Sequence, residues 1–258
     1  MKKFYLNMLG SLKSLHRQQS FCPVCGVQNA RFLPLPDFYR EHATRHGFIH
    51  FGKGEMTSLE TYMCSNCTAS DRERLYAWWL SRQIESLQLK RDIKCIHFAP
   101  EEALSKMIRN LNLFDYTTAD LGMKNVDFVE NIMSTSFEDE SFDFFICSHV
   151  LEHVENDDRA IQELYRITKK GGSGILMAPI IVGLKSTIED PTVTSEEGRW
   201  GMFGQYDHVR LYAHDDYVKK IRRRGFSIKE FGRDYFGANT FRCLGLKKTS
   251  ILYVVEKQ

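Results

Sequence analysis

The sequence lacks the features that mark membrane-spanning, secreted and repetitive proteins. No apolar run approaches the ~20 residues that a membrane-spanning helix needs. Residues 1–17 include basic side chains but neither a sustained apolar stretch nor a small-residue cleavage site, so we expect no signal peptide. No internal repeat or low-complexity segment is present. From these absences we expect a cytoplasmic protein without a membrane span.

The sequence also lacks an excess of either positive or negative charge. The 35 Lys and Arg residues nearly balance the 33 Asp and Glu residues, which leaves a net charge of +2. So weak a field would not by itself recruit nucleic acid or an anionic membrane. The 258 residues are 43% hydrophobic and 12% aromatic, enough for a substantial core. This length corresponds to ~1.7 domains of about 150 residues.

The seven cysteines are unevenly spread. Four of them form two CxxC pairs separated by 38 residues, at Cys22, Cys25, Cys64 and Cys67. Two such turns can complete a tetrahedral shell of four thiolates, which suits a structural Zn²⁺ because it leaves no position open for water. The alternatives are two disulfides or redox-active pairs. Redox CxxC motifs usually occur singly, and nothing indicates secretion, so the spacing favours zinc.

The chain divides by pattern into four segments. Residues 1–20 could form a short amphipathic helix, 21–70 the zinc module, 71–92 a linking helix, and 93–258 the main domain. In the main domain we predict strands at 93–99, 116–120, 142–147, 174–179, 226–231 and 251–256. Helices are expected at 101–110, from the third strand to about 168, and at 215–224, with Lys169–Gly172 closing the second. Such alternation predicts an α/β fold with a mostly parallel sheet covered on both faces.

The order of elements between residues 95 and 180 resembles class I S-adenosylmethionine-dependent methyltransferases. The segment SFDFFICSHVLEHV at 141–154, followed by ELYRI at 163–167 and KKGG at 169–172, is similar to their type-11 branch. The resemblance extends to the cysteine pairs, as an N-terminal zinc-binding extension. It implies a Rossmann-like, seven-stranded sheet and a methyltransferase that uses S-adenosylmethionine and releases S-adenosylhomocysteine.

The resemblance also implies cofactor contacts. Asp120, at the end of the second strand and next to Leu121, would accept hydrogen bonds from the ribose hydroxyls. Asn131 and Ile132 lie where the family reads adenine, although Asn131 could equally be an ordinary turn residue. Ser148 and His149 end the strand nearest the sulfonium. All of these cofactor contacts are expectations drawn from the resemblance.

The first loop departs from the family pattern. The sequence reads His97, Phe98, Ala99, Pro100 and Glu101 where the family has an acid and glycines. Proline removes a donor and alanine restricts the turn, so the loop is either an alternative cradle for the cofactor or a sign of altered binding. Glu101 could accept a hydrogen bond from the cofactor's ammonium group, or serve only as an acid in the first turn of a helix.

Histidines beyond the strand ends are the catalytic candidates, because methyl transfer to a hydroxyl requires removal of its proton. His149 and His153 would lie on one face of a helix, and Asp207 precedes His208 in an irregular stretch, 181–213, on the substrate side. We expect His208 as general base, since a nearby acid would tune it toward neutrality. Each also has a structural interpretation: His149 as a helix cap, His153 with Glu152 as a stabilising pair, and 207–210 as a loop anchor.

The basic run Lys219–Arg224 invites a nucleic-acid interpretation, but on a helix it is more simply a solvated face. The segment FGQYDHVR at 203–210 resembles one in a subset of these enzymes from glycan or secondary-metabolite pathways, so we expect an O-methyltransferase acting on a sugar, a glycan precursor or another small molecule. The alternatives are a nucleic-acid methyltransferase that grips its substrate with the zinc module, and a non-catalytic binding protein with this fold. The sequence leaves open the acceptor and the oligomeric state.

Overall fold

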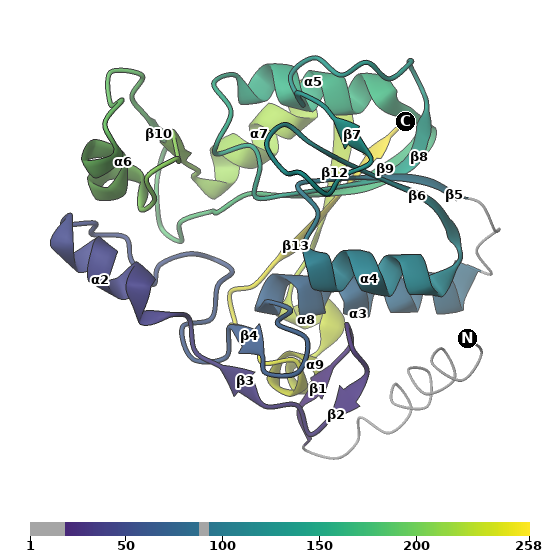
Figure 1. Ribbon diagram of the computed structural model, residues 1–258, viewed down its shortest axis with the longest axis horizontal. Helices are drawn as coiled ribbons and strands as arrows, with labels where there is room; N and C mark the ends of the chain where they lie inside the picture. The colour runs from purple at the N-terminus through teal and green to yellow at the C-terminus, as the bar shows by residue number, and fades with distance from the viewer. Residues whose placement is uncertain (1–18, 88–92) are drawn as a thin grey trace.

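A seven-stranded sheet forms the centre of the computed structural model, which describes residues 19–87 and 93–258 (Figure 1). Its strand order is β7-β6-β5-β8-β9-β13-β12. The strands from β7 to β9 pair in parallel, whereas β13 runs antiparallel to both of its neighbours. The predicted Rossmann-like, mostly parallel fold is confirmed.

Helices cover both faces of the sheet, so its central strands consist of nearly continuous apolar runs. The helices α3 and α4 lie on one face, and α5 and α7 lie on the other (Figure 1). The sheet strands are β5 (Ile93–Phe98), β6 (Phe114–Asp120), β7 (Phe128–Val129), β8 (Phe142–Ser148), β9 (Thr168–Met177), β12 (Phe226–Phe231) and β13 (Leu252–Lys257). The covering helices are α3 (Asp71–Leu87), α4 (Glu102–Leu111), α5 (Asp157–Ile167) and α7 (His214–Arg223).

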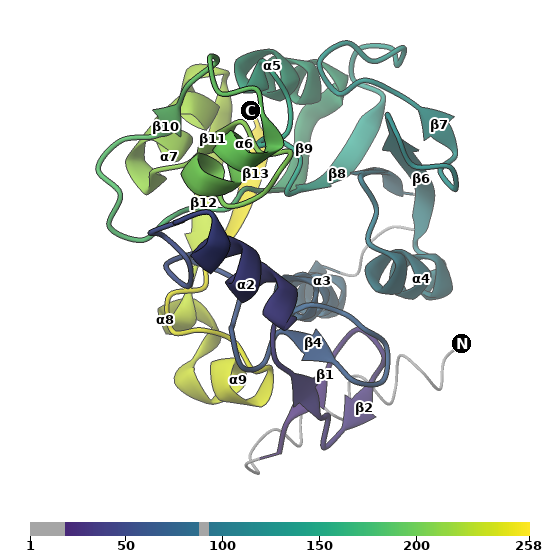
Figure 2. The ribbon, with the colours of Figure 1, turned by 60° about the vertical axis from the view of Figure 1, so that its left-hand side comes forward.

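Smaller elements flank this sheet on one side (Figure 2). The cysteine-bearing module consists of β1 (Phe21–Cys22), β2 (Val27–Gln28), β3 (Phe32–Leu33), α2 (Asp37–Arg45) and β4 (Met63–Cys64). The segment expected to be irregular contains β10 (Ile188–Glu189), α6 (Glu196–Phe203) and β11 (Arg210–Leu211). Two short helices, α8 (Arg233–Phe236) and α9 (Ala238–Cys243), precede β13. Among the described residues, no helix is long and apolar enough to cross a membrane.

Two predictions around α5 are wrong. The helix does not follow β8 directly, because residues 149–156 form turns and Asn156 caps the helix by accepting a hydrogen bond from Arg159 N at 2.9 Å. Residues 169–172 do not close the helix either. They lie within β9, where the pairing with β8 shifts register between Phe142 and Phe144 and Gly171 adopts a φ of +75°.

The helix α3 joins the cysteine module to the sheet. Its residues 75–81 are all buried, so it is covered on every side rather than along one stripe. Trp78 packs edge-on against Phe21 of the module, with ring centroids 6.3 Å apart, and Trp79 stacks at 6.2 Å on Phe144 of β8. One continuous core therefore runs from the module into the sheet. The amphipathic helix expected at 1–20 falls almost entirely outside the described residues, as do the last residues of the expected linker, 88–92.

The Arg74 side chain reinforces this junction from within. It is fully buried and donates hydrogen bonds to the carbonyl oxygens of Tyr62 (3.0 Å), Ala69 (3.0 Å) and Leu244 (2.8 Å). A fourth bond reaches Thr61 O at 2.5 Å. The guanidinium thus satisfies backbone carbonyls of both the module and the segment that follows α9, which no apolar side chain could do.

Replacing Arg74 by methionine should destabilise the fold by about 3 kcal/mol or more, because several buried carbonyls would lose their donor at once. Urea unfolding measures the change. Arg82→Met on the same helix is the matched control, because Arg82 is exposed, and its unfolding free energy should move by less than about 0.5 kcal/mol. Equal effects of the two substitutions would contradict the role of Arg74.

Candidate functional site

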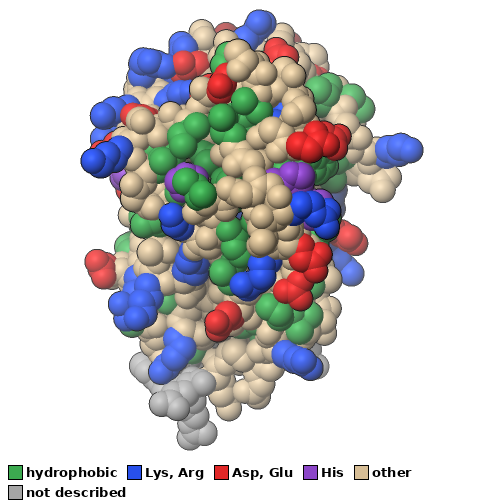
Figure 3. Space-filling view, turned by 90° about the vertical axis from the view of Figure 1, so that its left-hand side faces the viewer, with side chains coloured by type: hydrophobic (Ala, Val, Ile, Leu, Met, Phe, Trp, Pro, Cys, Tyr) green, Lys and Arg blue, Asp and Glu red, His purple; other side chains and the backbone are tan. Residues whose placement is uncertain are grey.

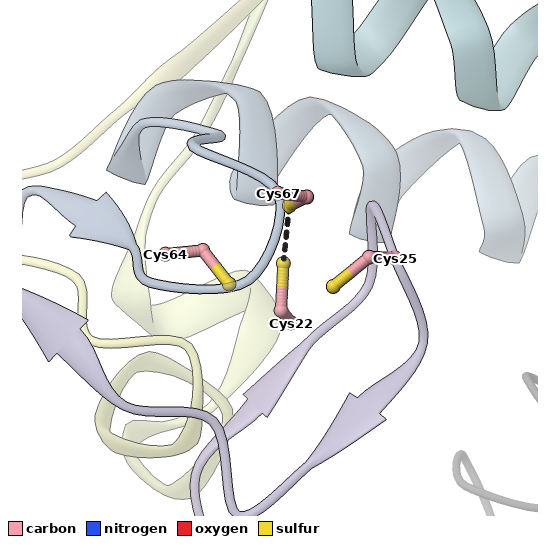
Figure 4. A group of neighbouring side chains, drawn as sticks. All are labelled: Cys22, Cys25, Cys64 and Cys67. Atoms are coloured by element: carbon pink, nitrogen blue, oxygen red, sulfur yellow. Dashed lines mark hydrogen bonds between the residues drawn. The ribbon is translucent and has the colours of Figure 1, made fainter.

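The four predicted metal-ligating cysteines lie together. Their sulfur atoms are all within 4.8 Å of one another and point toward a common centre (Figure 4). The sulfurs of Cys22 and Cys67 are 3.7 Å apart. Sulfurs that bind zinc tetrahedrally at about 2.3 Å would be about 3.8 Å apart, so this arrangement fits the ion.

The loop after β5 adopts a strained turn. Ala99 has a φ of +48°, in the region that glycine prefers, and its N–H donates to Ala119 O at 3.0 Å. The buried His97 contacts Tyr116 Oη through Nδ1 at 2.7 Å and Glu101 Oε2 through Nε2 at 2.9 Å. The chain therefore makes the backbone turn expected of a cofactor loop without the glycines, and His97 and Glu101 support it from behind.

Glu101 is held as a carboxylate. Burial raises its pKa, but the hydrogen bond with His97 and the nearby Arg72 outweigh that effect and lower it to about 2. The predicted contact of Glu101 with the cofactor's ammonium group stays a prediction. Glu101 precedes the first residue of α4 but makes no side-chain cap, and its oxygens face His97 and Arg72.

Asp120 and Asn131 both stabilise turns beyond the strand ends. Asp120 Oδ1 accepts from the N–H groups of Gly122 and Met123, each at 2.7 Å, and Oδ2 has no hydrogen bond among the described residues. Asn131 Oδ1 accepts from Met133 N at 2.9 Å, as in an Asx turn. One carboxylate oxygen of Asp120 thus stays available for a ligand. Leu121 beside it is largely exposed, and Ile132 is buried.

No sequence pattern pointed to Arg72, which lies in the first turn of α3. Its Nε is buried without a hydrogen bond and lies 3.7 Å from Glu101 Oε1. Only the position of α3 under the sheet brings this guanidinium to the cofactor loop, so no local motif could have revealed it.

A cavity of about 310 Å³ lies beyond the carboxyl end of β8. Three segments that are distant in sequence line it: residues 35–62 of the module, 149–153 after β8, and 203–211 of the inserted segment. Arg72, Pro179 and Ile181 complete its wall. Figure 3 views the molecule from the side of α2 and α6, where histidines appear among hydrophobic side chains. A larger hollow of about 620 Å³ around Arg166 lies elsewhere and is lined mainly by polar and charged side chains.

Glu152 lies at the centre of the histidine cluster in this cavity. Its side chain has no exposed surface, and its Oε1 lies 3.3 Å from His149 Nδ1, 3.8 Å from His153 Nε2 and 4.0 Å from His208 Nε2. Burial raises the pKa of Glu152, but the three histidines outweigh this and lower it to about 2. The motif at 148–153 contains this residue, yet its contact with His208 depends on the inserted segment.

The reason given for predicting His208 as the general base, that a nearby acid tunes its pKa toward neutrality, is wrong. Burial lowers the pKa of His208 to about 4, so the side chain is not tuned toward neutrality. Asp207 Oδ2 instead lies 3.2 Å from Nδ1 of His153, which is on a turn rather than on a helix. His149 does not cap a helix, and its N–H donates to Met177 O at 3.0 Å while its φ is +56°. Ser148 Oγ pairs with Tyr76 Oη at 3.0 Å, behind the strand end.

Residues 104–176 match the sequence profile of a family described as "Methyltransferase domain", which starts just after the unusual first loop. This segment of the chain is therefore similar to a methyltransferase domain. "Uncharacterized protein MJ1123" of Methanocaldococcus jannaschii is 48% identical over 40 residues, which cover 16% of this chain and 20% of that protein. The match thus spans about a fifth of the length of this curated relative.

Several solved structures are similar to the chain at low identity. YcgJ from Bacillus subtilis is 13% identical over 69% of this chain and 97% of its own, with a TM-score of 0.43. The [4+2]-cyclase SpnF is 14% identical over 88% and 97%, with a TM-score of 0.48. The CMeT domain of the citrinin polyketide synthase is 14% identical over 76% and 54%, with a TM-score of 0.49.

The module also contains a buried acid, Glu55, whose N–H donates to Ile180 O and whose Oε2 accepts from Tyr253 Oη at 2.9 Å. Burial raises its pKa from 4.5 to about 7. The folded protein therefore holds a proton that the unfolded chain releases above pH 4.5. This contribution is complete below pH 4.5 and is lost as the pH rises through 7.

Glu55→Gln should remove that dependence. Between pH 4.5 and 7 the contribution amounts to about 3 kcal/mol, so the unfolding free energy of the variant should fall less across this range than that of the wild type. Urea unfolding at a series of pH values measures it. Parallel pH profiles of the two proteins would show that Glu55 does not titrate in this window.

Proposed function

We propose that the protein transfers a methyl group from S-adenosylmethionine to a hydroxyl of a small molecule, with a sugar or glycan precursor as the leading class of acceptor. The observation that carries the proposal is the cavity beyond β8, where His149, Glu152 and His153 lie beside the strand end that the family places near the sulfonium. S-adenosylmethionine supplies a methyl group that is already activated by its sulfonium, so the protein must mainly orient the acceptor and take its proton.

The cofactor residues fit this group. The turn at Ala99 has the positive φ of a glycine turn, Asp120 Oδ2 is available for the ribose hydroxyls, and Arg72 Nε has no hydrogen bond. We assign the amino-acid carboxylate of the cofactor to Arg72, because a guanidinium pairs with a carboxylate in fork geometry. The predicted adenine contacts at Asn131 and Ile132, and those of Phe98, Pro100, Leu121 and Ser148, remain part of the proposal.

We assign the general base to His149 rather than to His208. Nδ1 of His149 faces Glu152, and its Nε2 is buried without a hydrogen bond in the wall of the cavity. Burial lowers the pKa of His149, so the ring is neutral at pH 7 and able to accept a proton. The resulting imidazolium would be stabilised by the Glu152 carboxylate, the arrangement by which acids support histidine bases.

The size and surroundings of the cavity favour a small molecule. Its volume is at the lower end of the range for small-molecule sites, about 300–1,000 Å³. The basic run on α7 is partly neutralised within the fold: Lys220 pairs with Asp157, and Arg223 and Arg224 pair with Asp158. These pairs weaken the nucleic-acid alternative, because the cations already have acidic partners.

The transfer test uses His149→Gln, with His214→Gln, a histidine outside the lining of this cavity, as the matched control. A screen of hydroxylated sugars and phenols first identifies an acceptor for the wild type. His149→Gln should then slow methyl transfer by about 10²–10⁴-fold while its affinity for S-adenosylhomocysteine stays unchanged. The control should remain within a few-fold of the wild type. Full activity of His149→Gln would refute the assignment of the general base. Failure of the wild type to bind the cofactor would refute the proposal that the protein is a methyltransferase.

We also propose that the four-cysteine site holds one structural Zn²⁺. Ordering of the module around the ion would contribute directly to folding. Cys67→Ser should abolish the zinc that a mercurial thiol reagent releases, and it should lower the thermal midpoint. Cys243→Ala removes a thiol outside the cluster and should keep that zinc. Release of the same zinc from Cys67→Ser as from the wild type would contradict the assignment.

A further inference from the structure

The Glu152 carboxylate is unusual because it is completely buried and its nearest nitrogen, Nδ1 of His149, is 3.3 Å away. Its side chain has no exposed surface, and neither oxygen has a hydrogen bond among the described residues. Burying a charged group is costly unless a partner compensates it. The imidazole nitrogens at 3.3 to 4.0 Å compensate this charge only in part, and a bound cation would compensate it further.

Two imidazoles approach this carboxylate in a way that suits metal ligation. One donor atom each from Glu152, His153 and His208 can be chosen so that all three lie within 4.8 Å of one another. Nε2 of His153 and Nε2 of His208 are 3.8 and 4.0 Å from Glu152 Oε1. Nitrogen and oxygen ligands at about 2.0–2.1 Å from a tetrahedral ion are about 3.3 Å apart. Small side-chain movements would therefore bring all three ligand atoms within bonding distance of one ion.

A second carboxylate orients one of these imidazoles. Asp207 Oδ2 lies 3.2 Å from His153 Nδ1 on the side away from Glu152. This contact places the ring proton on Nδ1 and leaves the Nε2 lone pair facing Glu152. Histidines that bind metals commonly donate their other ring nitrogen to a carboxylate in this way.

We propose that Glu152, His153 and His208 bind a divalent first-row transition metal, Zn²⁺ or Fe²⁺, within the cavity. Two imidazoles and one carboxylate are a ligand set of these ions, and three protein ligands leave coordination positions open. Because all three residues line the cavity, an open position would face a bound acceptor. There the ion would lower the pKa of a coordinated hydroxyl, and His149 would take its proton. This role in catalysis rests on the proposed function, whereas the binding of the metal does not.

Cobalt(II) is the probe, because its visible spectrum reports the ligands. Full-length protein with zinc in the four-cysteine site is titrated with Co²⁺ alone. We expect one further equivalent to bind with visible bands but without the thiolate-to-cobalt charge-transfer band that a cysteine site would give. Elemental analysis confirms that the zinc is retained.

The variants identify the ligands. His153→Gln changes a side chain that is 34% exposed, so it should fold normally and weaken Co²⁺ binding by more than about 100-fold. Glu152→Gln should also weaken Co²⁺ binding by more than about 100-fold. Asp207→Asn should weaken it by about 10–100-fold. His214→Gln, outside the cavity lining, should bind as the wild type does. The proposal is overturned if the folded wild type binds no Co²⁺ outside the cysteine site, or if His153→Gln binds it unchanged. Co²⁺ binding without methyl transfer to any acceptor would keep the site and reject only the proposed function.

Discussion

Complete burial of the middle of α3 is the constraint on which the rest of the structure depends. A surface helix buries one stripe, but residues 75–81 of α3 are all buried, with the cysteine module on one side and the sheet on the other. The same helix carries Arg74, which donates hydrogen bonds to carbonyl oxygens on both sides of the junction. It also carries Arg72, which lies beside Glu101 in the loop after β5. The position of the module is thus coupled to the geometry of the site.

The cavity follows from that arrangement. It is lined by a module loop, by the turn after β8 and by the inserted segment, so none of the three encloses it alone. The module loop is tied to the main sheet: Glu55 bonds Ile180 and Tyr253, and Thr249 Oγ1 donates to Glu55 O at 2.8 Å. A structural ion at the cysteines could therefore influence an acceptor that it never touches.

Local patterns predicted most of the sheet. Buried apolar runs such as 142–147 predict strands, and strong amphipathic periods such as 215–224 predict helices. These predictions hold because side-chain burial and backbone hydrogen bonding favour the same element there. The bulge at 168–173 was missed because its glycines are also typical of a helix end. The helices α2 and α6 were missed because each is stabilised by tertiary contacts, such as those between Trp200 and His42, rather than by a clear periodicity.

The site was predicted unevenly for similar reasons. The two CxxC pairs identified a cluster that the structure brings together, because ligand spacing is local information. The pairing of Asp207 with His208 was inferred from adjacency, but the turn places Asp207 against His153. The partners of Glu152 come from two segments more than fifty residues apart, a proximity that only the folded chain creates.

The most direct test of this account is a crystal structure of the protein with S-adenosylhomocysteine. The account predicts that the ribose lies on Asp120, the carboxylate on Arg72, and the sulfur toward His149 at the mouth of the cavity. A cofactor held at another edge of the sheet, or with its sulfur facing away from the cavity, would contradict it.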